Sequence, residues 1–284
     1  MTAVPCLRIR AGGLPLKAPP FAYAKPRSLA EALDLLERPG AKILAGGQSL
    51  IPSLNMRLST PELLVDIGAI SSLGGIELKG SALRISALTT HAQIQHSERV
   101  QRHLPMLASA AAQIAHPAIR NRGTLGGSLA LADPAAEYPA CALALDATLV
   151  IQGKKGERRT KASDFFKGLF ETELKPVEIL TGAEFPIGGE SSFHELARRQ
   201  GDYASVGLAA HRRDSDIRLA FFGVGAKSIL AKHAAAEAKN SIAAAQQALA
   251  KDLDPPADLY HSGAAKLHLA RVLLGRALAQ WNMK

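Results

Sequence analysis

The chain has 284 residues and the composition of an ordinary globular protein, which excludes a disordered or low-complexity class. Its formal net charge is +9, but only 5% of the residues are aromatic and the Lys and Arg residues are scattered along the chain, so nucleic-acid binding is not expected. At this length a single core begins to divide, and we expect two or three subdomains.

The cysteine content and the first twenty residues indicate the cellular compartment that we expect for this chain. Cys6 and Cys141 are too few for a disulfide framework and for an iron–sulfur cluster, which typically takes four thiolates. The first twenty residues carry Arg8, Arg10, Lys17 and several prolines without a continuous apolar segment, which makes them a poor signal peptide. No apolar run is long enough for a membrane span. These features predict a reduced, cytoplasmic setting, with any cluster on another chain.

Apolar periodicity and turn residues predict alternating helices and strands as far as the middle of the chain. The first helix has the capping box Ser28 with Glu31 and ends at Pro39-Gly40. In chain order the predicted elements are an irregular extension over 1–20, a helix over 28–37, a strand over 42–45, a helix over 49–58, a strand over 63–67, paired strands over 75–78 and 83–87, a short helix ending at Gln95, a helix over 99–115, a loop over 118–123, a helix over 134–145, and a hairpin of strands over 148–152 and 157–160.

The last third predicts a separate α+β unit with its own core. Its predicted elements are strands over 178–185, 192–198, 204–211 and 217–224, an alanine-rich helix over 231–250, a break at Asp254-Pro255-Pro256, and an amphipathic helix over 264–281. The segment 205–211 fits a helix equally well, so both alternatives stay open there.

Two segments with adjacent glycines are the strongest candidates for a binding site. They are Ala45, Gly46, Gly47, Gln48, Ser49 and Leu50 in the first segment, and Thr124, Leu125, Gly126, Gly127 and Ser128 in the second. Glycine lets the backbone approach a ligand and turn its N–H groups toward an anion, so the two segments can hold the two phosphates of one dinucleotide. Neither is a P-loop or a Rossmann fingerprint. A Gly-Gly turn before a helix also occurs where nothing is bound, and the residues alone leave that alternative open.

A helix start is predicted directly after the second glycine segment. Asp133 is a good N-cap, Pro134 suits the first turn, and Glu137 falls near the positive end of the helix dipole. A glycine turn that leads to a helix N-terminus is a plausible phosphate seat.

These segments, taken in order, resemble the FAD-binding medium subunits of the xanthine dehydrogenase and carbon monoxide dehydrogenase family, the molybdenum hydroxylases. The matching segments are 45–52, 57–58, 61–67, 119–128, 132–136, 197–204, 252–259 and 269–273, and the similarity extends from about residue 21 to the end.

The resemblance implies an α+β fold with a two-part FAD-binding domain of the vanillyl-alcohol oxidase type over 21–186, divided at about 60 and 61, and a smaller α+β C-terminal domain over 187–284. The FAD pyrophosphate is expected on backbone N–H groups of the two glycine segments. Asp133 and Glu137 lie where relatives contact the ribityl chain, although relatives more often carry Asp at position 137. Tyr203 matches an aromatic position near the isoalloxazine in some relatives, and the alternative is a core tyrosine that braces a strand.

The function that the resemblance implies is electron relay. FAD on this chain takes electrons from two [2Fe-2S] clusters of a small subunit, a large molybdopterin-binding subunit holds the substrate site, and a dimer of heterotrimers is expected. No catalytic residue is assigned to this chain, and Glu195 is given no role. His194-Glu195 opens like a zinc motif, but Arg198 stands where the second histidine belongs, so no metal is expected. The alternatives are a non-redox assembly module of the same fold and a free-standing FAD oxidoreductase.

Overall fold

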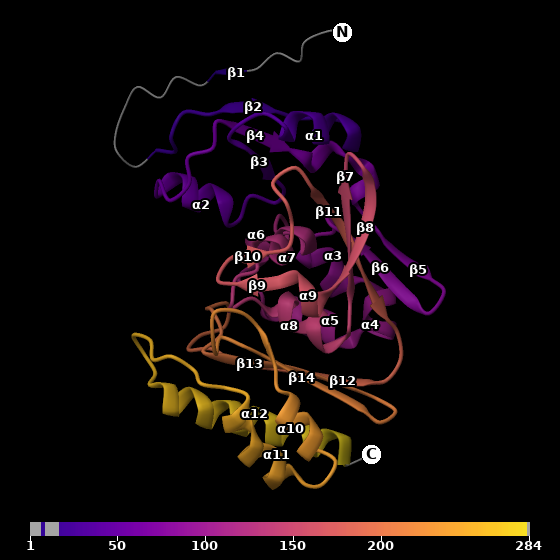
Figure 1. Cartoon of the computed structure of the whole chain (residues 1–284), viewed down its shortest axis with the longest axis vertical. Coiled ribbons are helices and arrows are strands. Elements are labelled where there is room, and N and C mark those ends of the chain that lie inside the picture. The colour runs from indigo at the N-terminus through magenta and orange to yellow at the C-terminus, as the bar shows by residue number, and fades with distance from the viewer. Residues whose placement is uncertain (1–6, 9–16, 283–284) are drawn as a thin grey trace.

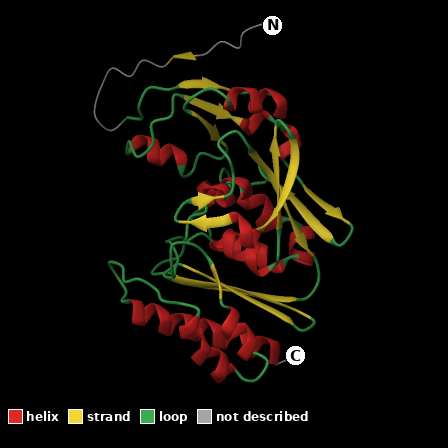
Figure 2. Cartoon of the chain, viewed as in Figure 1, coloured by secondary structure: helices red, strands yellow, loops and turns green. Residues whose placement is uncertain are grey.

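The structure, a computed structural model, describes residues 7–8 and 17–282. Figure 1 shows three stacked layers along the long axis, each built around a sheet, with the N-terminal sheet at one end and the C-terminal helices at the other. Figure 2 shows helices and strands in all three layers, and the expected mixed helix and strand content is confirmed. Most of the extension expected over 1–20 lies outside the described residues; Leu7–Arg8 forms strand β1.

The first layer is a four-stranded sheet in the order β1-β2-β4-β3. Strands β2 (Ala22–Ala24), β4 (Leu63–Asp66) and β3 (Ala41–Leu44) are parallel, and helices α1 (Leu29–Leu36) and α2 (Leu50–Asn55) lie in the two crossovers. Such βαβ connections need one buried helix face, and α1 supplies it with Ala32, Leu33 and Leu36. Strand β4 pairs with both β2 and β3, so the first sheet extends beyond residue 60.

The second layer is a five-stranded antiparallel sheet in the order β5-β6-β11-β7-β8, with helices on one face. Its strands are β5 (Ile76–Lys79), β6 (Ala82–Ser86), β7 (Thr148–Gly153), β8 (Gly156–Lys161) and β11 (Ile179–Pro186). Its helices are α3 (His91–His96), α4 (Glu98–His103), α5 (Pro105–Gln113), α6 (Pro117–Arg120), α7 (Leu125–Leu131), α8 (Glu137–Ala144) and α9 (Ala162–Phe165), and the short strands β9 (Phe166–Gly168) and β10 (Glu171–Thr172) form a hairpin beside them. The predicted hairpins of the second sheet are confirmed.

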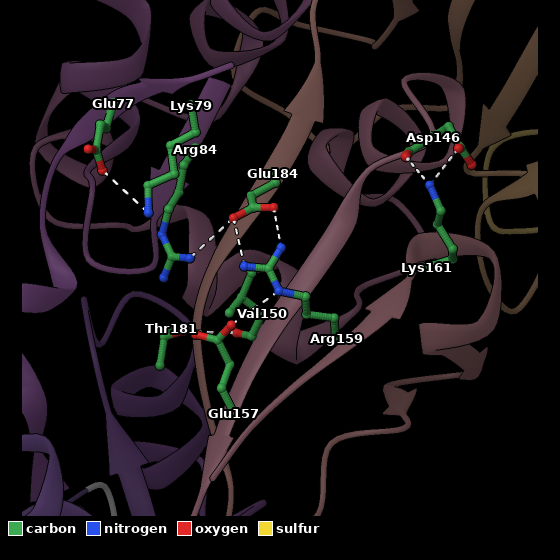
Figure 3. Close-up of polar contacts among 10 residues, drawn as sticks. All are labelled: Glu77, Lys79, Arg84, Asp146, Val150, Glu157, Arg159, Lys161, Thr181 and Glu184. Carbon is green, nitrogen blue, oxygen red and sulfur yellow. Dashed lines mark hydrogen bonds and ion pairs between the residues drawn. The ribbon is translucent and has the colours of Figure 1, made fainter. Parts of the chain in front are cut away.

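The opposite face of the second sheet carries ion pairs that link β6, β11 and β8 across the intervening β7. Glu184 on β11 lies between Arg84 on β6, at 3.4 Å, and Arg159 on β8, at 2.6 Å (Figure 3). Alternation explains the arrangement, because Leu83 and Ile85 on either side of Arg84 are fully buried against the helices. The sheet therefore has one apolar face and one charged face.

The third layer is an antiparallel sheet covered by helices on both sides. Its order is β12 (Glu190–Leu196), β13 (Val206–Arg213), β14 (Asp216–Phe222) and β15 (Ile229–Leu230). On β13, Leu208 packs toward the C-terminal helices and Ala209 toward the core that contains α5 and α8. The segment 205–211 is therefore a strand, and the helix alternative is wrong.

Three expected elements, apart from the second glycine segment and the helix after it, differ from the structure. The helix predicted over 99–115 is two helices, α4 and α5, because Pro105 has no N–H and forces Leu104 out of the helical region, to φ −140°. The loop predicted over 118–123 contains helix α6. The helix predicted over 231–250 is divided into α10 (Lys232–Glu237), α11 (Ile242–Ala248) and a short 3-10 turn.

The second division has a local cause. Ser241 adopts an extended backbone and its Oγ accepts a hydrogen bond from the N–H of Ala244 at 3.0 Å, which begins a new helix. Helix α12 (Gly263–Asn282) confirms the predicted terminal helix. Within the described ranges, no helix is both long and apolar enough to cross a membrane.

Candidate functional site

The two glycine segments, about eighty residues apart in the sequence, meet in space. A Cβ atom placed on Gly46 would lie 2.1 Å from the carbonyl oxygen of Arg122 and 2.9 Å from the Cα of Gly123. Backbone therefore packs directly on backbone at this junction, which only glycine permits. On the other side, Ala45 lies beside Gly127. The sequence-predicted segments are thus parts of one junction between the first and second layers.

The first segment follows β3, and its backbone N–H groups are not used in hydrogen bonds within the described structure. Gly47 has φ +73°, a left-handed conformation that turns the chain toward α2. Among the described residues, none accepts a hydrogen bond from the backbone N–H groups of residues 46–50. Ser49 precedes α2 without a side-chain cap bond, and Leu50 is its first residue. Gln48 is exposed, and its Nε2 donates to the carbonyl oxygen of Gly46 at 3.0 Å. The segment thus presents backbone donors at the surface.

The second segment has a different structure from the one predicted. It is not a turn before a helix, because Leu125, Gly126, Gly127 and Ser128 are themselves the first turn of α7. Thr124 is the N-cap. A Cβ atom on Gly126 would lie 2.5 Å from the Cβ of Ala87, so this glycine lets α7 pack closely on the end of β6.

Four of the five N–H groups of the second segment are already paired. Leu125 donates to Thr89 O at 3.0 Å, Gly126 to Ala87 O at 2.8 Å, Gly127 to Thr124 Oγ1 at 3.1 Å, and Ser128 to Thr124 O at 3.0 Å. The sequence predicts that these N–H groups face an anion. Residues that follow β6 and Thr124 itself accept from these four instead, so among the described residues the free donors of the junction are those of the first segment and the N–H of Thr124.

The predicted helix start at Asp133 and Pro134 is wrong. Ala132 has φ +52° and ends α7, and Asp133 then accepts a hydrogen bond from the N–H of Ala135 at 2.9 Å in a side-chain turn. Helix α8 begins only at Glu137, after Ala136 as N-cap. Glu137 nevertheless occupies the first helical turn, as predicted.

Helix α7 separates the glycine junction from this acidic turn. Its seven residues span about 10 Å, with Thr124 at one end and Ala132 at the other. The turn itself is held on the third layer, because the N–H of Gly223 donates to the carbonyl oxygen of Pro134 at 2.9 Å. The site is therefore elongated and extends from the first layer to the third.

Three partly buried carboxyl groups lie at the third-layer end. Burial, the nearby Glu195 and then Asp133 raise the pKa of Glu137 to about 8. Burial raises the pKa of Glu195 to about 7 and raises that of Asp133 above its usual value. Sequence reasoning gave Glu195 no role. The only signal for it was its place two residues after Phe193 on a strand, which puts both side chains on the same face.

Tyr203 lies at the same end of the site and is 76% exposed. The alternative of a core tyrosine is therefore wrong. Desolvation of its hydroxyl, followed by the charges of Asp133 and Glu137, raises the pKa of Tyr203. Its loop rests on the second layer, since a Cβ on Gly201 would lie 2.8 Å from the Cε1 of His116. The structure thus brings Tyr203, Asp133 and Glu137 together.

Two further side-chain contacts are not predicted by the sequence, and the first of them lies at the glycine junction. His91 lies under Gly123, where an added Cβ would be 2.5 Å from its Nε2, and burial followed by the charge of Arg120 lowers the pKa of His91 to about 4. Arg198 stacks on the ring of Tyr260 at 3.7 Å from the ring centroid. Neither contact is visible in the sequence, because each joins segments that are distant along the chain.

No cluster of three or more His, Cys, Asp or Glu side chains placed to hold a metal ion occurs in the part of the chain that the structure describes. The site offers glycine backbone, free N–H donors, hydroxyl groups and an exposed aromatic ring. These groups suit an elongated anionic ligand with a planar end.

Comparison with known proteins assigns the chain to a family. Residues 19–188 match the family model "FAD binding domain in molybdopterin dehydrogenase", and residues 191–281 match "CO dehydrogenase flavoprotein C-terminal domain". The chain is 39% identical over 282 residues to the 6-hydroxypseudooxynicotine dehydrogenase complex subunit alpha of Paenarthrobacter nicotinovorans, covering 93% of this chain and 95% of that one.

Two further relatives agree over similar lengths. The carbon monoxide dehydrogenase medium chain of Hydrogenophaga pseudoflava is 36% identical, with 93% of this chain and 98% of that one covered. A solved structure of carbon monoxide dehydrogenase from the same organism superposes with a TM-score of 0.88 at 36% identity, over 92% of this chain and 97% of that one. The chain therefore belongs to the FAD-binding medium subunits of the carbon monoxide dehydrogenase and xanthine dehydrogenase family, the molybdenum hydroxylases.

Proposed function

We propose that this chain binds one FAD across the elongated site and relays electrons through it. The electrons come from two [2Fe-2S] clusters on a small partner subunit and leave to an external acceptor. A large molybdopterin-binding subunit oxidises the substrate. The bound flavin supplies the redox chemistry, while the chain binds it, orients it and sets the electrostatic field around it.

The observation that carries this proposal is the junction of the glycine segments. Gly46 packs against the backbone of Arg122, and the N–H groups of residues 46–50 have no described acceptor at the surface of that junction. Free N–H groups beside a left-handed glycine form the concave donor arrangement that binds phosphate. A non-redox assembly module has no need of such unused donors.

The residues present fit FAD in a definite order. The first segment would hold the pyrophosphate with its N–H groups, and the hydroxyls of Thr124 and Ser128 would border it. Asp133 and Glu137, about 10 Å further along α7, would lie at the ribityl chain. Tyr203 would contact the isoalloxazine with its exposed ring.

We further propose that residues 21–186 form a FAD-binding domain of the vanillyl-alcohol oxidase type and residues 187–284 the C-terminal domain. Strand β4 pairs within the first sheet, so the subdomain division expected at about residue 60 would fall after β4 if it follows the sheets. We propose a dimer of heterotrimers in the cytoplasm. Two relatives are themselves a subunit of a dehydrogenase complex and a medium chain, which supports the assembly.

The test is an absorbance spectrum of the chain purified alone and with the proteins that copurify from its own host. A flavin spectrum, iron–sulfur bands and two further subunits are expected. A colourless chain that binds no added FAD would contradict the proposed function but not the fold. A flavin-loaded single chain that oxidises a substrate by itself would favour a free-standing oxidoreductase instead.

A further inference from the structure

Two carboxyl groups from different layers lie at the third-layer end of the site, and the charge of one acts on the other. Glu137 is the first residue of α8, and Glu195 lies on β12. Phe193, two residues before Glu195, stacks on Phe222 at 5.7 Å within the core that also contains α8. Alternation therefore directs Glu195 to the same side of the sheet, toward α8.

The buried Cys141 supports this placement. It follows Glu137 by one helical turn, and a residue four positions on lies on the same face of a helix. Burial, then the charge of Glu137 and then that of Glu195, raise the pKa of the Cys141 thiol. Both carboxyl groups therefore act on one face of α8.

Among the described residues, neither Glu137 nor Glu195 has an ion pair. The charges that act on Glu137 are those of Glu195 and Asp133, whereas desolvation alone raises the pKa of Glu195. The titratable groups around the pair, from α8, the preceding turn, the Tyr203 loop and β12, are Asp133, Tyr138, Cys141 and Tyr203. Two negative charges at this place would repel one another without relief.

Hydrogen bonding relieves only one member of the pair, since the carboxyl group of Glu137 accepts a hydrogen bond from its own backbone N–H, which lowers its pKa. The Oε2 atom of Glu195 is buried and has no hydrogen-bond partner among the described residues, and the same holds for the hydroxyl of the fully buried Tyr138. A buried carboxylate oxygen that accepts no hydrogen bond is costly as an ion, whereas its protonated form is not.

We propose that Glu137 and Glu195 share one proton at neutral pH, and that binding of FAD takes up a proton from solvent at this pair. The second part rests on the proposed function, because Asp133 and Tyr203 place the pair beside the ring end of the flavin. A ligand there excludes water from the two carboxyl groups, which further disfavours their charged form. Glu195 is thus a positioning residue that limits the negative charge under the ligand.

The first experiment measures FAD binding by titration calorimetry at pH 8 in two buffers of different ionisation enthalpy, together with the FAD Kd between pH 7 and pH 9. Net proton uptake is expected, with a Kd that rises by up to about tenfold per pH unit. Glu137→Gln and Glu195→Gln should each reduce the uptake, and the double variant should abolish it. Glu190→Gln is the matched control, because Glu190 lies on the same strand but pairs with Arg212.

The second experiment uses the chain without FAD. Infrared spectroscopy at pH 7 should show a protonated carboxyl band that is absent from the Glu137→Gln/Glu195→Gln variant and present in Glu190→Gln. Absence of that band from the unaltered chain would overturn the shared proton. Equal proton uptake in the unaltered chain and the double variant would overturn the coupling. A chain that shows the band but binds no FAD at any pH would refute the proposed function and leave the shared proton standing.

Discussion

The Oγ1 atom of Thr124 accepts a hydrogen bond from the N–H of Gly127 at 3.1 Å and so begins α7 at the glycine junction. Loss of this cap in Thr124→Ala should destabilise the chain by about 1 kcal/mol and weaken FAD binding. Thr124→Ser keeps the hydroxyl and should behave like the unaltered chain. Urea unfolding and FAD fluorescence titration check the pair of variants, and equal loss in both would show that the hydroxyl is not responsible.

Gly46→Ala should disrupt the junction itself. The added methyl group would collide with the carbonyl oxygen of Arg122, so backbone must shift, at a cost of about 1–3 kcal/mol. The control is Gly74→Ala, because a Cβ there meets only one atom, at an ordinary 3.6 Å, and the residue has no positive φ. Chemical denaturation should separate the two variants, and similar stability would contradict the close approach.

Bulky residues at the second glycine of each segment should remove the flavin. Gly47→Val forces a branched residue into a left-handed conformation, and Gly127→Val places a Cβ 2.9 Å from the Thr124 hydroxyl oxygen. Flavin content per chain is measured by absorbance after refolding with FAD, with circular dichroism as the check on folding. If both variants retain full FAD, the site lies elsewhere.

The chain without FAD should lose stability as pH rises from about 6.5 to about 8. Below this range the loss is offset, because His91 and His211, whose pKa values are lowered to about 4 in the folded chain, favour folding as pH rises toward 6.5. The pKa of Glu137 and of Glu195 is higher in the folded chain, about 8 and about 7, than in the unfolded chain. The folded state therefore binds more protons in this window, and the loss is about 1.4 kcal/mol per pH unit for each extra proton held. Denaturant midpoints across this range, compared with Glu195→Gln, test the sign. A stability that rises with pH would contradict it.

Tyr203 should matter to the ligand and not to the fold. Its side chain is largely exposed, so Tyr203→Ala should change the free energy of unfolding by no more than about 0.5 kcal/mol. If the ring contacts the isoalloxazine, the same variant should shift the absorbance and increase the fluorescence of bound FAD, whereas Tyr203→Phe should not. Unchanged spectra in both variants would place the ring of FAD away from this residue.

Local sequence signals predict most helices and strands but not the tertiary contacts between them. Ser28 caps α1 through the N–H of Glu31, as expected, yet the carboxylate of Glu31 accepts from the N–H of Arg27 and not from that of Ser28. The division before Pro105 is readable from the proline, and the break at Ser241 is readable from Asn240 and Ser241, two residue types that favour caps over helix interiors.

The site was predictable only in its parts. Glycine pairs mark backbone that needs close approach, which identified both segments. The sequence could not show that the end of β6 would take the N–H groups of Leu125 and Gly126, because that bond joins residues almost forty positions apart. Glu195 was missed for the same reason, since only its contact with α8 distinguishes it from any other strand residue.

The core shared by the second and third layers has a consequence for how the chain folds. Phe222 and Ala209 from the third layer are buried in the same apolar cluster as Leu107 of α5 and Ala140 of α8. A fragment ending near residue 188 would leave that face of α5 and α8 in water, so we do not expect the flavin-binding half to persist as an independent unit. The two halves should then unfold in one cooperative transition. A substitution that destabilises the C-terminal region should therefore also weaken the binding of FAD, which is held mostly by the other half.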